Sequence, residues 1–95
     1  MDLTEFRGSL QAAEPPQLTL PLQALWWDAK GDWQRAHTCA QADPGADAAA
    51  VHAYLHRKEG DDSNAAYWYS RAGRRASQLS LQEEWEEIAG SLLQS

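Results

Sequence analysis

Apolar residues recur every three or four positions along most of the chain, which is the spacing of a helix that buries one face. The first clear run begins at Pro21, which suits the first turn of a helix, and Gly31 ends it. Its apolar positions are Leu22, Leu25, Trp26 and Ala29. The pattern therefore predicts a helix between Pro21 and Gly31.

Three more helices are predicted from the same spacing together with capping and turn residues. Their expected spans are residues 33–42, 48–59 and 63–72. Each follows an aspartate that can cap its N-terminus, namely Asp32, Asp47 and either Asp61 or Asp62. The sequence DPG at 43–45 ends the first of these helices, and Gly60 and Gly73 end the other two.

A fifth helix is predicted near the C-terminus. Ser80 and Glu83 form a capping box, and the apolar positions after it lie four, three and four residues apart. These positions are Leu81, Trp85, Ile88 and Leu92. The acidic residues Glu83, Glu84, Glu86 and Glu87 fall largely on the other side. One face of this helix is therefore predicted to be buried and the other to be solvated.

The chain before these helices is predicted to behave differently. Residues 1–18 hold a weakly amphipathic segment that ends at Pro15 and Pro16, and a helix interior does not tolerate proline well. We therefore expect an N-terminal arm over residues 1–18, either flexible or containing a short helix, and a single helical-repeat domain over residues 19–95.

A shift of 29 residues superposes two copies of one unit. The matching pairs are Ala24 with Ala53, Trp27 with His56, Gly31 with Gly60, Asp32 with Asp61 and Ala36 with Ala65. The pairs fall at small residues where helices cross, at a bulky ring and at a Gly-Asp turn. Because a helical hairpin cannot cover its own apolar face, we predict an all-α fold of two stacked helix-turn-helix hairpins with the fifth helix as a C-terminal cap.

Two stretches resemble known families. GDWQRA and GDDSNAAYWYSRA resemble the turn and second helix of tetratricopeptide and Sel1-like repeats, over roughly residues 20–73. This resemblance implies a right-handed stack of hairpins that binds a protein or peptide. Those repeats run to about 34 residues in three or more copies, whereas this chain has two copies 29 residues apart. VHAYLHRKEGD with NAAYWYSRAG also resembles a family of short, mostly bacterial proteins without an assigned activity.

Composition argues against several classes of partner. A net charge of -6 over 95 residues works against nucleic-acid binding, which depends on lysine and arginine. No stretch approaches the roughly 18 apolar residues that a membrane span needs. Cys39 is the single cysteine, and the N-terminus lacks the features of a signal peptide. We therefore expect a reduced, cytoplasmic protein with neither nucleic acid nor membrane as partner.

The sharpest chemical hypothesis is a metal site on the helix over residues 48–59. His52 and His56 lie four residues apart and Glu59 three further on, so all three can share one face, as ligands of zinc or another divalent metal do. His37 can supply a third imidazole only if it faces this helix. One observation argues against a metal. The repeat aligns His56 with Trp27, at a position that a packed ring normally occupies. If His56 is such a packed ring, no cofactor is expected.

A binding groove is the second hypothesis. Neighbouring residues of a helix point about 100° apart, so adjacent rings cannot all face the core, and some should line a groove. Arginines beside them can hold a peptide carboxylate or the acidic face of a second copy, although cations near helix ends also complement the helix dipole. The predicted groove residues are Trp27, His52, His56, Trp68, Tyr69, Arg71, Arg74 and Arg75.

Catalytic motifs are weak. Cys39 and His37 lie two residues apart and face away from each other on a helix, and neither a nucleophile elbow nor a glycine-rich phosphate loop is present. No catalytic residue is predicted. The favoured function is a protein or peptide interaction module that can also associate with itself. The alternative is a metal-binding or small-ligand-binding protein, conceivably an enzyme, centred on His52, His56 and Glu59.

Overall fold

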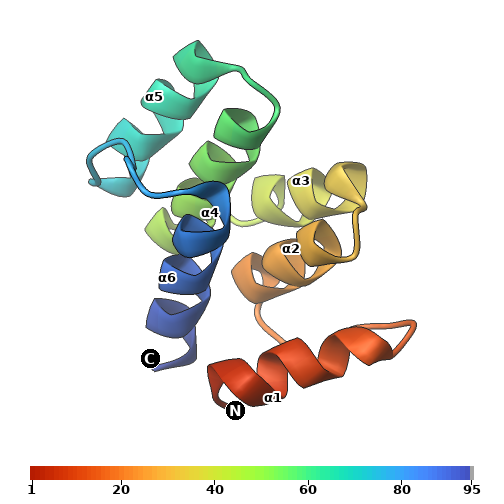
Figure 1. Cartoon of the computed structure of the whole chain (residues 1–95). Coiled ribbons are helices and arrows are strands. Elements are labelled where there is room, and N and C mark those ends of the chain that lie inside the picture. Colours follow the sequence, from red (N-terminus) through yellow and green to blue (C-terminus); the bar gives the residue numbers. More distant parts are fainter. Residues whose placement is uncertain (95) are drawn as a thin grey trace.

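The computed structural model describes residues 1–94, and this part of the chain contains helices and no strand. The elements are α1 (Leu3–Gly8), a 3-10 turn η1 (Ser9–Gln11), α2 (Leu20–Ala29), α3 (Trp33–Gln41), α4 (Ala46–Lys58), α5 (Asp62–Ala72) and α6 (Leu81–Leu93). Figure 1 shows their arrangement. The prediction of an all-helical fold is confirmed.

The turns of the two predicted units are built in the same way. Gly31 has φ 85° and Gly60 has φ 86°, a conformation that a residue with a side chain rarely adopts. Asp32 N–H donates to the Trp27 carbonyl at 2.9 Å, and Asp61 N–H donates to the His56 carbonyl, also at 2.9 Å. The carboxylates of Asp32 and Asp61 both cap the helix that follows. The 29-residue register therefore marks equivalent turns, between α2 and α3 and between α4 and α5.

The start of α4 differs from the sequence prediction. Asp47 lies inside the first turn of α4, and Gly45 is the N-cap residue. The Asp43 carboxylate accepts the Gly45 N–H at 2.8 Å, so the polar side chain that organises this turn precedes the helix by three residues. The acidic side chain of Asp47 still suits the positive end of the helix dipole.

Helix α4 is the centre of the molecule. It packs against α2, α3, α5 and α6, and all nine residues from 48 to 56 are buried. In Figure 1, α5 and α6 lie on one side of α4 and the α2–α3 hairpin on another, while α1 runs past the ends of α2 and α6. A side chain on α4 can therefore contact any of four neighbouring helices, whichever way it points.

The N-terminal arm contributes a core residue. Phe6 on α1 is fully buried, and its ring stacks on Trp85 of α6 with centroids 5.6 Å apart. Trp26 Nε1 donates to Ser9 Oγ at 3.0 Å, and Lys30 Nζ donates to the Leu10 carbonyl at 2.8 Å. The arm is thus docked on α2 and α6, which the weak amphipathic pattern of residues 1–18 did not indicate.

A buried carboxylate joins α2 to α4. Asp28 is 4% exposed, and it accepts hydrogen bonds from the Tyr54 hydroxyl and from Lys58 Nζ, both at 2.9 Å. Burial, and then the charge of Asp28, raises the pKa of the Tyr54 phenol above its ordinary value. The phenol therefore remains a hydrogen-bond donor at neutral pH, and the buried charge keeps both of its partners.

A second buried carboxylate joins α6 to α4 and α5. Glu84 is 1% exposed and accepts bonds from the Tyr69 hydroxyl at 2.6 Å and from Arg57 at 2.9 Å. The sequence pattern assigned Glu84 to the solvated side of this helix. It points inward because α4 and α5 supply a cation and a hydroxyl, which compensate the loss of hydration.

Candidate functional site: a three-histidine cluster

All three histidines of the chain lie together, although they come from two helices. His37 is on α3, and His52 and His56 are on α4. Their ligand atoms all lie within 4.8 Å of one another, and the Nε2 atoms of His37 and His52 are 2.9 Å apart. The ring centroids of His52 and His56 are 4.9 Å apart. Three imidazoles therefore converge on one point between α3 and α4.

Trp33 fixes the approach of α3 to this point. Its indole Nε1 donates to the Leu55 carbonyl of α4 at 3.0 Å. Its ring lies parallel to that of His37 one turn later, with centroids 4.8 Å apart and planes 10° apart. The stacked pair on α3 thus directs the His37 imidazole toward α4, where His52 and His56 share a face because they are four residues apart.

Helix α5 covers the other side of the cluster. The Trp68 ring lies parallel to His52 at 3.8 Å between centroids, and the Arg71 guanidinium lies 5.4 Å from the Trp68 ring. His52 is 3% exposed and His56 9% exposed, while His37 is half-buried. Of the three imidazoles, that of His37 therefore has the most contact with solvent.

A carboxylate adjoins the cluster at its outer edge. The Glu59 Oε1 atom lies 2.6 Å from His56 Nδ1. Asp61 also lies near, and His56, Glu59 and Asp61 have ligand atoms within 4.8 Å of one another. However, the Asp61 carboxylate accepts both the backbone N–H and the side-chain amide of Asn64, so it is engaged in capping α5.

Two imidazoles of the cluster, those of His37 and His52, have lowered pKa values, which favour their neutral form near pH 7. Burial, and then the neighbouring rings of His37 and His56, lowers the pKa of His52 to about 4. Burial, and then His56, also lowers the pKa of His37. A neutral imidazole carries the nitrogen lone pair that a metal ion requires. Protons therefore compete weakly with a metal for these two rings at neutral pH.

The structure groups different residues from those of the metal site predicted from sequence. His52 and His56 lie together, as their spacing indicated, but Glu59 contacts His56 at Nδ1 and does not form a common group of ligand atoms with both His52 and His56. The condition placed on His37 is met, because its Nε2 atom contacts His52 on α4. The ligand atoms of His37, His52 and His56 lie within 4.8 Å of one another, so these three imidazoles replace the predicted set as the candidate ligands.

The predicted groove residues are distributed over different surroundings. Trp68 and Arg71 adjoin the cluster, as described above. Trp27 packs edge-on against Trp26 and lies beneath the Arg35 guanidinium at 4.4 Å. Tyr69 is 4% exposed and its hydroxyl is held by Glu84, and the residue lines a hollow together with Arg74 and Arg75.

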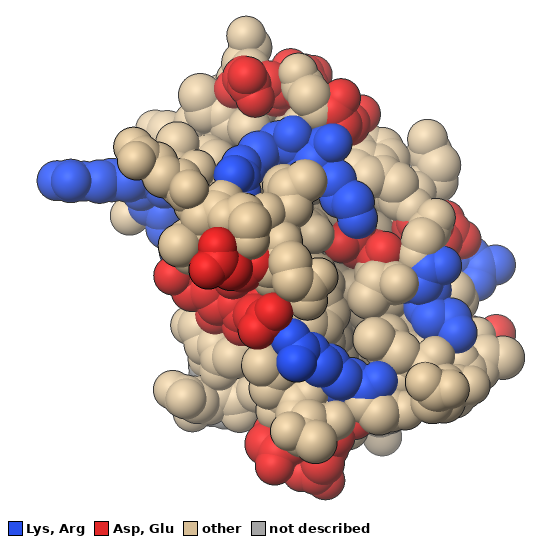
Figure 2. All heavy atoms as spheres, in the orientation of Figure 1, with Lys and Arg blue, Asp and Glu red and all other residues tan. Residues whose placement is uncertain are grey.

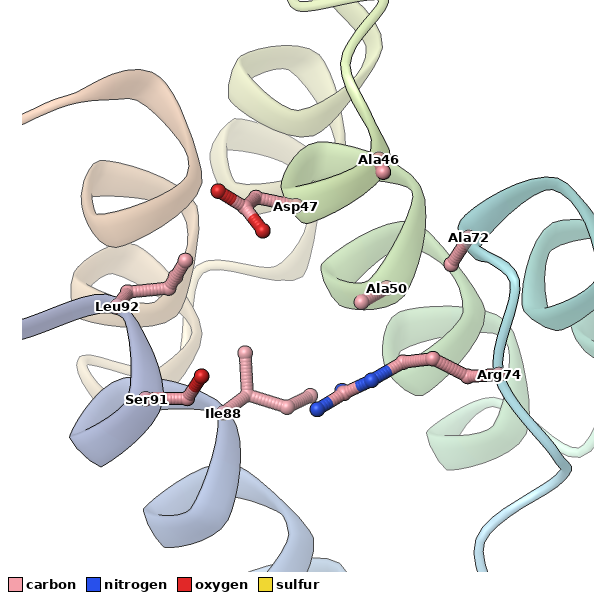
Figure 3. A pocket seen from close by; sticks show the side chains of 8 residues that line it. All are labelled: Ala46, Asp47, Ala50, Ala72, Arg74, Ile88, Ser91 and Leu92. Carbon is pink, nitrogen blue, oxygen red and sulfur yellow. The ribbon is translucent and has the colours of Figure 1, made fainter. Parts of the chain in front are cut away.

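Arg74 and Arg75 lie beside hollows on the α5–α6 side of the molecule. Figure 3 shows the Arg74 guanidinium and the Asp47 carboxylate facing one hollow of about 230 Å³ from different walls, and Ile88 and Leu92 of α6 also line it. Arg74 and Arg75 also line a second hollow of about 210 Å³ near Glu84. The histidines line neither of these hollows.

A third hollow, larger than the two beside Arg74, lies where the arm meets α2, α4 and α6. It measures about 340 Å³, and the buried pair Asp28 and Tyr54 lies at its wall together with Arg7, Lys58 and Trp85. Lys58 is bound to Asp28, and Arg7 forms an ion pair with Glu86 at 2.9 Å. Each charge here therefore already has a partner within the protein.

The surface shows no single dominant charge on the face in view. Figure 2 shows acidic and basic side chains interspersed across it. Among the described residues, no helix is both long enough and apolar enough to cross a membrane. Comparison of the chain with protein-family models, curated proteins and solved structures finds no match. The two resemblances noted in the sequence therefore stay predictions.

Proposed function

We propose that this protein binds a transition-metal ion, with Zn²⁺ as the first candidate, through the imidazoles of His37, His52 and His56. The observation that carries the proposal is the convergence of their ligand atoms within 4.8 Å of one another. Nitrogen ligands bind Zn²⁺ at about 2.0–2.1 Å, so two of them on a tetrahedral ion lie about 3.4 Å apart. The Nε2 atoms of His37 and His52, now 2.9 Å apart, would separate to that spacing when the ion binds.

The donor set favours one group of metals. Imidazole suits zinc, copper and nickel, whereas calcium and magnesium prefer oxygen ligands. Three protein nitrogens would leave the fourth position of a tetrahedral ion to water or another ligand, as in zinc sites that perform chemistry. The lowered pKa values of His37 and His52 support the proposal further, because metal binding would displace few protons from these rings near pH 7.

Zinc titration of tag-free protein tests this proposal. We expect the wild-type chain to bind one equivalent of Zn²⁺ in calorimetry and in competition with a chromophoric chelator. His37→Ala, His52→Ala and His56→Ala should each weaken binding by about 100-fold or more, since each removes a ligand; loss of an outer hydrogen-bond partner alone costs about 10- to 100-fold.

The matched control is Gln34→Ala, which alters an exposed side chain of α3 one turn before Thr38 and leaves the imidazoles intact. Circular dichroism of every variant should show the wild-type helix content. Absence of binding by the folded wild-type chain, or wild-type affinity in all three histidine variants, would contradict the proposal.

The finer description of the fold is also a proposal. We infer that α2–α3 and α4–α5 form a stack of the tetratricopeptide or Sel1-like type, and the equivalent turns at Gly31 and Gly60 support this. Binding of a protein or peptide, including a second copy of the chain, stays a prediction. Tyr67 of α5, which is 52% exposed and adjoins Trp68, is a large aromatic side chain available for it.

A further inference from the structure

The Glu59 carboxylate contacts one particular nitrogen of His56, Nδ1, and this matters for the proposed metal site. We propose that Glu59 is a positioning residue: its carboxylate accepts the Nδ1–H of His56, which leaves the Nε2 lone pair of that ring for the metal, and Glu59 itself does not bind the ion. This inference rests on the proposed metal-binding function and specifies how one ligand of the site is prepared for it.

The geometry of an imidazole ring underlies the inference. The two ring nitrogens lie at different edges, and a neutral ring carries its proton on only one of them. A carboxylate is an acceptor, so at 2.6 Å from Nδ1 it keeps the proton on that nitrogen. Nδ1 is then unavailable to a metal, and Nε2 has its lone pair free. A carboxylate that fixes a metal-binding histidine in this way also makes the ring a better donor.

The backbone holds Glu59 in place for this contact. Glu59 is the C-cap residue of α4, and its N–H donates to the Leu55 carbonyl at 3.2 Å. The next residue, Gly60, turns the chain away with φ 86°. The Glu59 side chain therefore reaches back along the last turn of α4 to the residue three positions earlier, which is His56.

The neighbouring charged groups do not compete for this carboxylate. Arg57 is bound to Glu84 and Lys58 to Asp28, so the two cations that precede Glu59 are both directed elsewhere. Asp61, the other carboxylate within reach of His56, is engaged by Asn64. Glu59 is thus left with His56 as its hydrogen-bond partner, and His56 has Glu59 as the acceptor at Nδ1.

Two assignments of Glu59 make different predictions. If Glu59 were a direct ligand beside His52 and His56, its removal would weaken zinc binding as much as removal of a histidine. If it acts through His56, its removal should leave a weaker site that still binds one equivalent, with a loss of about 10- to 100-fold.

The test combines the proton position with zinc affinity. Long-range ¹H–¹⁵N correlation spectra of the metal-free wild-type chain should show His56 with its proton on Nδ1. In Glu59→Ala, His56 should shift toward a mixture of both tautomers, and the affinity for zinc alone should fall by about 10- to 100-fold. Glu59→Gln keeps an oxygen acceptor at this place and should recover part of both properties.

Asp62→Ala is the matched control, because it removes one exposed carboxylate three residues away. It should leave the His56 tautomer and the zinc affinity unchanged. A wild-type His56 protonated on Nε2, or unchanged zinc affinity in Glu59→Ala, would overturn the role of Glu59 while the metal site itself stands. Loss of all binding in Glu59→Ala would overturn it in favour of a direct ligand. A wild-type chain that binds no zinc would overturn both the proposed function and this role.

Discussion

Replacing Arg57 with alanine is expected to lower the free energy of unfolding by about 3–5 kcal/mol. The substitution leaves the Glu84 carboxylate, 1% exposed, with the Tyr69 hydroxyl as its remaining partner. A buried charge without its counterion is far more costly than the pair itself is stabilising. Urea unfolding followed by tryptophan fluorescence measures the change, since five tryptophans report on the core.

A double variant separates the cost of the isolated charge from a general loss of packing. Arg57→Met combined with Glu84→Leu should recover most of the stability, because apolar side chains of similar size replace both charges. Arg75→Ala, on an exposed side chain, should change the free energy by less than about 0.5 kcal/mol. An Arg57→Ala variant as stable as Arg75→Ala would show that the buried pair is not formed.

The second large effect is expected at Trp26. This side chain of α2 is fully buried and bonds to Ser9 of the arm, and Trp26→Ala should cost about 3–5 kcal/mol through the cavity it leaves. The adjacent Trp27 is only partly buried, and Trp27→Ala should cost less than half as much. The two substitutions are a matched comparison, because both remove a tryptophan from α2 and only the direction in which the side chain points differs.

Thermal unfolding by circular dichroism and urea unfolding both measure this difference. The loss in Trp26→Ala should be accompanied by weaker protection of the backbone amides of α1, since Ser9 loses the indole N–H that it accepts. Equal destabilisation by the two substitutions would contradict the assignment of Trp26 to the core and Trp27 to its edge.

The helices and their turns could be predicted because they depend on neighbours in the sequence. The Gly31 and Gly60 turns follow from glycine's freedom to adopt positive φ and from the capping aspartates beside them. The shared face of His52 and His56 follows from their spacing on one helix. Each of these features depends on residues within about two helical turns of one another.

Features that depend on how helices cross could not be predicted in the same way. His37 reaches His52 only because Trp33 anchors α3 to the Leu55 carbonyl, 22 residues further along the chain. The inward direction of Glu84 likewise depends on Arg57, 27 residues earlier. A local pattern of polar residues does not identify partners that are distant in the sequence. The pattern therefore placed Glu84 on the solvated face and did not determine which way His37 points.

The docked arm illustrates a third case. Helix α1 is only six residues long, with Leu3 and Phe6 as its large apolar residues, and two prolines follow in the sequence. So short a pattern indicated only weak amphipathicity. The burial of Phe6 depends on Trp85 of α6, which offers a stacking partner at 5.6 Å. The core therefore extends further toward the N-terminus than the pattern of apolar positions indicated.

X-ray absorption at the zinc edge tests the three-imidazole centre most directly. Tag-free protein loaded with one equivalent of Zn²⁺ should show three imidazole nitrogens at about 2.0–2.1 Å and one further light ligand. The imidazole count should fall to two in His37→Ala, which removes the one ligand that α3 contributes. A first shell of oxygen ligands alone, or an imidazole count unchanged by His37→Ala, would contradict a metal centre built between α3 and α4.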